Sequence, residues 1–184
     1  MKNGVKKIEQ EEKLRCYLKY SGPDVESGTI DVKNLAPALL AFNNSINKIY
    51  RHVTDNSANH CNTYVKVLSK GSFNIDLDVV GSVLITASQS GTISAIKIAY
   101  ETLIKQIFLK KFLKGKPPTH VQPIYGNKVE IENIDNSKVT INAQTYNIYV
   151  NKLVDNDLKD LTEPLGAGIE TVTLGNREGG GNIN

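Results

Sequence analysis

Two neighbouring segments of alternating polar and apolar residues constrain the fold more than any other part of the sequence. They cover residues 63–68 and 72–79, and the short turn Ser69-Lys70-Gly71 between them completes the pattern of a β-hairpin. The second segment alternates between apolar residues at Phe73, Ile75, Leu77 and Val79 and polar residues at Asn74, Asp76 and Asp78. Because successive side chains of a strand point to opposite faces, one sheet face is apolar and the other largely polar. We therefore expect helices to cover only the first face.

Two helical patterns are expected to provide this cover. Residues 32–53 carry apolar side chains at three- and four-residue spacing, which predicts an amphipathic helix capped by Asp31. Residues 81–113 are again helical in pattern, with a break where Ser90 or Thr92 would cap the second piece. The predicted fold class is α+β, a mostly antiparallel sheet packed against one amphipathic helix and one long, strongly apolar helix or helix pair.

The remaining predicted elements are shorter. Strands are expected at residues 14–20, 128–132, 138–142 and 168–174, and short helices at residues 145–151 and 155–161. Residues 115–127 are expected to form a linker, which is also a candidate boundary between subdomains. The charged residues 1–13 are expected to fray, and the glycine-rich residues 175–184 to form a disordered tail. The chain has 184 residues, which suits a single domain over residues 14–174.

Composition narrows the class of protein. The 22 basic and 19 acidic residues give a net charge of +3, too balanced for the strong positive field of a dedicated DNA-binding domain. Cys16 and Cys61 belong to no metal-ligand spacing and are interpreted as free thiols in a reducing compartment. Residues 1–15 lack the apolar core of a signal peptide, and polar residues interrupt the apolar stretch at 79–112. These observations predict a cytoplasmic protein without membrane partners.

Histidine and cysteine offer little sign of catalysis. His52, His60 and His120 have no Cys, Asp or Glu partner at metal-ligand spacing, and they are interpreted as surface residues. Cys61 follows His60 directly, and a thiol–imidazole pair would require Cys61 to be exposed and activated. A buried strand cysteine is the simpler interpretation.

Paired carboxylates are the other candidates for chemistry. Asp76 and Asp78 share the polar face of one strand, and Glu130 and Glu132 share a face of another. Such pairs can bind a metal ion, but more often they keep a sheet face soluble. No catalytic residue, metal or cofactor is therefore predicted.

A basic cluster near the end of the second helix is the candidate site for a ligand or phosphate. Its members are Lys105, Lys110, Lys111, Lys114 and Lys116. Lysines can neutralise phosphate oxygens, and the nearby Tyr100 and Phe112 could offer stacking. The alternative is a solvated helix end whose charges complement the helix dipole. The lack of arginine and of a second basic segment favours that alternative.

The second helix is apolar around much of its circumference. A helix of this kind must lie between two layers or contact another chain, because a single contact face would leave part of it in water. The residues expected at an interface between copies of the chain are Ile96, Tyr100, Leu103, Ile107 and Phe108. The chain itself is therefore one predicted partner.

Several short motifs are specific. Residues 20–25 read YSGPDV, Gly28 follows, residues 31–40 read DVKNLAPALL, and residues 71–77 read GSFNIDL. In this order the segments resemble a family of uncharacterised bacterial and phage proteins, and the likeness covers most of the chain. The family has no assigned function, so the resemblance supplies no catalytic residues. Its members continue into a further β-rich domain, so we expect a truncated or compact relative.

Three functional hypotheses follow. The preferred one is a non-enzymatic, homo-oligomeric binding protein of a phage or mobile element, which acts on host defence by sequestering a nucleotide signal or blocking a protein. The alternative is a nucleic-acid-binding accessory protein that uses the lysines of residues 105–116. A third is an enzyme that uses Asp76 and Asp78 with a divalent metal ion.

Overall fold

The computed structural model describes residues 7–69, 73–86, 94–166, 168–177 and 182–183, and within them it confirms the α+β class. The strands are β1 (Lys7–Ser21), β2 (Cys61–Ser69), β3 (Phe73–Thr86), β4 (His120–Ile124), β5 (Lys128–Glu132), β6 (Lys138–Asn142), β7 (Thr171–Asn176) and β8 (Asn182–Ile183). The helices are α1 (Val32–Val53), α2 (Ala95–Phe112), α3 (Ala143–Val150) and α4 (Asp155–Thr162), and a short 3₁₀ helix spans Pro23–Val25.

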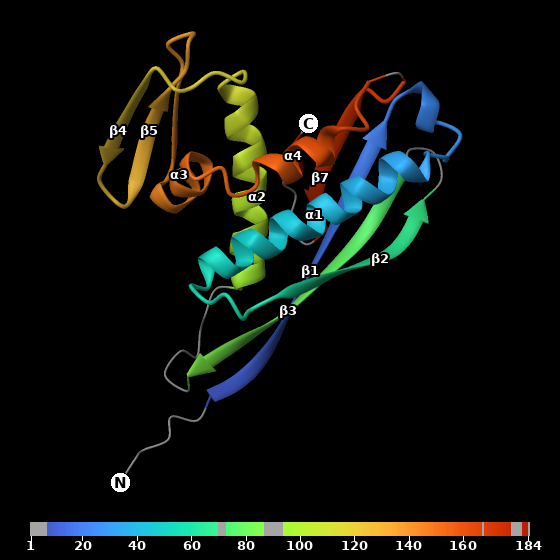
Figure 1. Cartoon of the computed structure of the whole chain (residues 1–184), viewed down its shortest axis with the longest axis horizontal. Coiled ribbons are helices and arrows are strands. Elements are labelled where there is room, and N and C mark those ends of the chain that lie inside the picture. The colour runs from blue at the N-terminus through green and yellow to red at the C-terminus, as the bar shows by residue number, and fades with distance from the viewer. Residues whose placement is uncertain (1–6, 70–72, 87–93, 167, 178–181, 184) are drawn as a thin grey trace.

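The larger of two antiparallel sheets has the strand order β2-β3-β1-β7-β8. Helices α1, α2 and α4 lie against one of its faces (Figure 1). Alternate residues of β1 and β3 point into the core beneath these helices, namely Leu14, Cys16, Leu18, Tyr20, Phe73, Ile75, Leu77 and Val79. The predicted hairpin and its apolar face are therefore confirmed.

Helix α1 begins and ends where the sequence predicted. The Asp31 carboxylate accepts a hydrogen bond from the Lys33 amide at 2.9 Å, which satisfies one of the free N–H groups at the helix start. Pro37 is the sixth residue of the helix, so the helix lacks the hydrogen bond that an N–H group there would donate to the carbonyl of Lys33. Lys48 of α1 forms a 2.6 Å ion pair with Asp157 of α4. This ion pair joins α4 to α1.

The smaller sheet, β4-β5-β6, lies at the C-terminal end of α2, as Figure 1 shows. Its core contains Leu109 and Leu113, together with Ile131 and other apolar residues of the sheet. Near the middle of α2, the fully buried Gln106 donates a 2.6 Å hydrogen bond to the carbonyl of Thr145 in α3. Helix α2 therefore contributes side chains to two cores, one at each of its ends.

Two predictions about the ends of β1 and β3 are wrong, and for one reason. Residues 81–86 continue β3 rather than starting a helix, and residues 7–13 belong to β1 rather than to a frayed leader. These segments pair with each other, from Lys7 opposite Thr86 to Lys13 opposite Val80. Each segment alone has a weak strand pattern, and the partner strand supplies the hydrogen bonds that make it a strand.

The start of α2 also differs from its predicted position. Ser94 caps the helix by accepting a hydrogen bond from the Lys97 amide at 3.3 Å. The predicted caps Ser90 and Thr92 lie outside the described residues. The helix begins at Ala95 because strand β3 occupies the chain up to Thr86.

Two segments expected to be irregular contain strands. The predicted linker at residues 115–127 includes β4, which pairs with β5. In the predicted tail, Gly175 and Asn176 complete β7, and β8 pairs with β7 at its free edge. An open edge presents unpaired N–H and C=O groups, so even a short polar segment can be ordered there. Residues 178–181 and 184 of the predicted tail lie outside the described residues.

One carboxylate joins α2 to the large sheet. The two oxygens of Glu12 in β1 accept hydrogen bonds from the amides of Ala95 and Ile96, at 3.2 and 3.0 Å. The Ser94 hydroxyl donates a third, to the same carboxylate, at 3.3 Å. A carboxylate at a helix N-terminus pairs with free N–H groups and with the positive pole of the helix dipole.

We predict that Glu12→Ala lowers the free energy of unfolding by about 1–3 kcal/mol, because the helix start loses its acceptors. The measurement is urea denaturation followed by circular dichroism. Glu11→Ala is the matched control, since Glu11 is the exposed neighbour, and it should change stability by less than about 0.5 kcal/mol. Equal effects of the two substitutions would contradict this account of how α2 is anchored.

Candidate functional site

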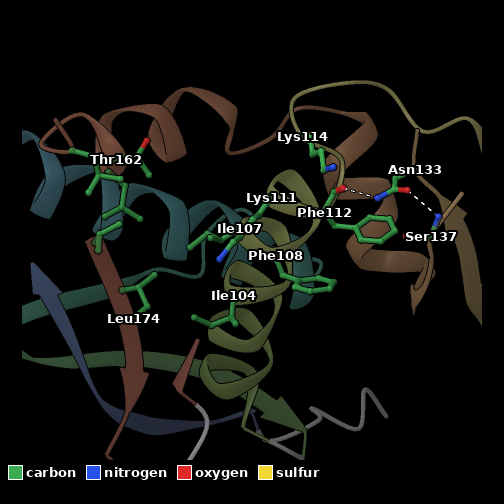
Figure 2. A pocket seen from close by; sticks show the side chains of 13 residues that line it. Ile104, Ile107, Phe108, Lys111, Phe112, Lys114, Asn133, Ser137, Thr162 and Leu174 are labelled. Carbon is green, nitrogen blue, oxygen red and sulfur yellow. Dashed lines mark hydrogen bonds between the residues drawn. The ribbon is translucent and has the colours of Figure 1, made fainter. Parts of the chain in front are cut away.

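A groove of about 730 Å³ lies alongside α2. Helix α2 forms its floor, α4 and β7 form one wall, and the turn between β5 and β6 forms the other (Figure 2). The lining residues are Ile104, Ile107, Phe108, Lys111, Phe112, Lys114, Asn133, Ser137, Leu161, Thr162, Leu165, Val172 and Leu174. We refer to this hollow as the α2 groove.

Apolar side chains of α2 that neither core covers completely form the floor of the α2 groove. Figure 2 shows Ile107 on the side of the helix that faces Leu174, and Phe112 on the side that faces Asn133. The rings of Phe108 and Phe112 stack with centroids 6.1 Å apart, and Phe108 remains 39% exposed. The floor thus offers an open aromatic surface beside aliphatic side chains.

Asn133 holds the β5–β6 turn against the end of α2. Its amide group donates a 3.0 Å hydrogen bond to the carbonyl of Phe112, and its carbonyl oxygen accepts from the amides of Asp135 and Ser137, both at 3.0 Å. Asn133 is buried, and these bonds use its donor and acceptor groups within the fold. It therefore shapes the groove rather than offering a group to a ligand.

The structure separates the lysines of the predicted basic cluster. Lys110 forms a 2.9 Å ion pair with Asp155, and Lys114 forms an ion pair with Asp135. Of the other three members, Lys105 and Lys116 are exposed outside the groove, and Lys111 lines the groove together with Lys114. The prediction of a ligand or phosphate site at these lysines remains untested, and two of the five have acidic partners.

The residues expected at an interface between copies have two different locations. Ile96, Tyr100 and Leu103 are buried in the chain's own large core, beneath the other elements. Ile107 and Phe108 line the α2 groove and reach the surface. Of the five residues, only Ile107 and Phe108 could therefore contact a second copy, and they would do so through the α2 groove.

The paired carboxylates contact basic side chains. Asp76 forms an ion pair with Arg177, and Lys138 pairs with Glu130 at 2.8 Å and more loosely with Glu132 at 3.8 Å. No group of three or more His, Cys, Asp or Glu side chains suited to a metal ion occurs among the described residues.

Asp78 is the centre of the largest ion-pair cluster on the sheet. Lys13 lies 2.9 Å from its carboxylate, Lys66 lies 3.4 Å away and Arg15 lies 3.9 Å away. Burial of Asp78 disfavours its charged form, but hydrogen bonds and charge from Lys13 and Lys66 outweigh this effect and lower its pKa. The carboxylate is therefore ionised at neutral pH and part of a structural network.

The cysteines and histidines lie apart from the groove. Cys61 is buried, and burial raises the pKa of its thiol to about 12, so the thiol is protonated at neutral pH. His60 beside it is exposed, as are His52 and His120. Cys16 is also buried, and its burial raises the pKa of its thiol to about 12. Neither thiol has the exposure and ionisation that a nucleophile needs.

Sequence reasoning did not identify the wall formed by α4 and β7. It predicted both elements, but it assigned no role to Leu161, Leu165, Val172 or Leu174. These residues lie some fifty positions or more beyond the floor residues along the chain. Only the packing of α4 on α1 and of β7 on β1 brings them beside α2.

Comparison with protein-family models, with curated proteins and with solved structures gave no match. Among the described helices, none combines the length and the apolar character needed to cross a membrane.

The lowered pKa of Asp78 predicts a dependence of stability on pH. Because the folded-state pKa lies below the unfolded-state value of about 3.9, Asp78 stabilises the fold above that pH, and this contribution is lost as pH falls through the folded-state pKa. We expect Asp78→Asn to lower the free energy of unfolding by about 1–2 kcal/mol at neutral pH. The difference from wild type should shrink between about pH 5 and pH 2.

Urea denaturation at a series of pH values measures this difference. Asp135→Asn is the matched control, because it removes a more exposed ion pair with Lys114, and it should cost less than about 0.5 kcal/mol. A difference between Asp78→Asn and wild type that stays constant down to pH 2 would contradict the assignment.

Proposed function

We propose that this chain is a non-catalytic binding protein whose α2 groove takes an amphiphilic anion. The apolar or aromatic body of the ligand lies on the floor of the groove, and its anionic group lies at the end marked by Lys111 and Lys114. The observation that carries the proposal is the groove itself, with its open aromatic floor beside positive charge.

The size and lining of the groove support a small ligand. Binding sites for small molecules are typically clefts of about 300–1,000 Å³, lined mainly by apolar and aromatic side chains with a few polar groups. The α2 groove has a volume of about 730 Å³, and eight of its thirteen lining residues are apolar. Phe108 contributes an accessible ring to which a flat ligand can stack.

The polar end of the groove supports an anionic group. A helix C-terminus repels anions, because its last carbonyl groups are unpaired and the dipole is negative there. Here the side chain of Asn133 donates to the carbonyl of Phe112, which removes part of this repulsion. Lys111 and Lys114 place ammonium groups at the same end, and Ser137 adds a hydroxyl. An anion at this end therefore meets the ammonium groups of Lys111 and Lys114, of which Lys114 is also paired with Asp135.

The lining supports binding rather than turnover. Among the lining residues of the α2 groove, all of them in the described part of the chain, there is no Asp, Glu, His or Cys. A serine or threonine nucleophile usually needs an adjacent base such as His, Asp or Glu to activate it, and no such side chain lines the groove beside Ser137 or Thr162. Retention of an unchanged ligand is the role that fits this lining.

The resemblance to bacterial and phage proteins suggests a biological setting for such binding. A nucleotide has both parts of the proposed ligand, a flat base and an anionic phosphate. In a phage or mobile element, a protein of this kind would sequester a nucleotide signal of host defence. An aliphatic carboxylate shares the same amphiphilic chemistry, so the experiment must separate the two.

The first test uses 1-anilinonaphthalene-8-sulfonate, an aromatic anion whose fluorescence rises in apolar surroundings. We expect saturable binding by the wild-type chain. Phe108→Ala should weaken it by about tenfold, because the ring loses its apolar contact. Lys111→Gln should weaken it by about threefold, because an exposed charge contributes little. The two substitutions remove the apolar and the ionic part of the site separately.

Matched controls lie outside the groove. Tyr125→Ala removes a fully exposed aromatic residue and Lys116→Gln an exposed lysine, and neither should change the affinity. Thermal melting of each variant verifies that it folds. Displacement of the dye by adenosine monophosphate supports the nucleotide form of the proposal, and displacement by decanoate supports the aliphatic form.

Two results would overturn the proposal. One is dye binding that is equally strong in wild type, Phe108→Ala and Lys111→Gln. The other is a dimer in light scattering that dissociates in Phe108→Ala, which would assign the groove to a second copy of the chain.

A further inference from the structure

The large sheet has a second face, opposite α1 and α2, which we call the outer face. The side chains that point to it alternate with the core residues of β1 and β3. From sequence this face was expected to be polar, with Asp76 and Asp78 as its charged members on β3. The structure adds side chains from β1, from β2 and from the end of β7.

Around Asp78 the carboxylate is buried and the cations are exposed. The side chain of Asp78 is only 6% exposed, whereas those of Lys13, Arg15 and Lys66 around it are 42%, 66% and 57% exposed. One carboxylate therefore holds three cations in place, and the cations form the part that solvent meets. An approaching ligand experiences a positive surface, although its centre is acidic.

A second ion pair of the outer face is formed by Asp76. Its carboxylate pairs with Arg177, whose guanidinium carbon lies 4.8 Å from the centroid of the Tyr17 ring. The Tyr17 ring lies against the backbone of Gly175 in β7, so closely that a Cβ atom at Gly175 would come within 2.2 Å of a ring carbon. Glycine at this position is what lets the tyrosine lie across β7, and Arg177 stacks on it.

Two planar groups on this face can stack with a flat ligand. Tyr64 in β2 is 53% exposed, and it lies directly across from Asp78 in the register of β2 and β3. The guanidinium of Arg177 lies over the Tyr17 ring of β1 and is paired with Asp76 of β3, the strand next to β2.

The sum of charges on the outer face is positive. Lys19 adds a further cation opposite Asn74 and Thr173, and among the described residues it has no acidic partner. By strand alternation Glu11 adds one further carboxylate. Among the side chains that the structure describes on this face, Lys13, Arg15, Lys19, Lys66 and Arg177 outnumber Glu11, Asp76 and Asp78 by two.

We propose that the outer face of the large sheet binds single-stranded nucleic acid, with phosphates at its lysines and arginines and bases stacked on Tyr64 and on Arg177. Open sheet faces with aromatic side chains, and grooves that combine cations with stacking groups, are general solutions for binding single strands. Charge complementarity favours a polyanion as the occupant of this face. The planar groups favour one with exposed bases over a duplex.

This proposal uses a different face of the molecule from the α2 groove, so either can fail without the other. It also differs from the expectation that nucleic acid would bind the lysines near the end of α2. Lys105 and Lys116 of that cluster belong to the helix α2 region, and α2 packs on the opposite face of the sheet. Variants in the two regions therefore distinguish the sites.

The experiment measures fluorescence anisotropy of labelled single strands of about 12 nucleotides, one of DNA and one of RNA, with the full-length chain. We expect dissociation constants of about 1–100 µM at low salt. With about three phosphate contacts, affinity should fall about 20-fold between roughly 50 and 200 mM salt.

Two pairs of substitutions test the location. Tyr64→Ala should weaken binding about tenfold, and Tyr125→Ala, which removes an exposed aromatic residue elsewhere, should leave it unchanged. Lys19→Glu should weaken binding by about tenfold, and Lys105→Glu is the matched charge reversal outside the face. Neither Tyr64 nor Lys19 belongs to the ion-pair cluster around Asp78. The fold should therefore persist in both variants, which circular dichroism verifies.

Several outcomes would overturn the proposal. No saturable binding of either single strand is one, and loss of binding with Lys105→Glu but not with Lys19→Glu is another. Equal affinity for a duplex, or for a labelled polyglutamate peptide with no effect of Tyr64→Ala, would show a surface for anions in general.

Discussion

The pairing of β1 with β3 is the constraint on which the rest of the structure depends. The two strands are hydrogen-bonded from Lys7 opposite Thr86 to Tyr20 opposite Phe73. This register decides which side chains face the helices and which face away, because a shift of one residue would exchange the two faces. It also places Glu12 where its carboxylate receives the start of α2. The orientation of α2, and with it the groove, follows from this strand pair.

Helix α2 buries apolar side chains in two separate cores of the same chain. Ile96 and Leu103 pack into the large core, and Leu109 and Leu113 pack into the core of the small sheet. The remaining apolar side chains, including Phe108, line the groove between the two parts. Packing between layers thus removes most of the helix from water, and a ligand can cover the rest.

The two faces of the large sheet differ in kind. The inner face is a packed apolar core, whereas on the outer face the buried carboxylate of Asp78 pairs with exposed cations. Asp78 shows the principle, since a nearly buried charge is retained only when partners compensate for its lost hydration. Those partners come from neighbouring strands. The proposed binding surfaces therefore lie on opposite sides of one sheet, and each uses a different force, apolar contact in the groove and charge on the outer face.

The sequence by itself determined the local elements whose signals are short-range. Asp31 begins α1 as expected, the two strands of the predicted hairpin pair as β2 and β3, and the short helices and the strand pair near Asn136 lie close to their predicted positions. Only the tertiary structure decided the strand character of residues 7–13 and 81–86, the walls of the groove and the positive outer face. The physical reason is the same in each case. Hydrogen bonds between distant strands and ion pairs across them depend on partners that no local pattern contains.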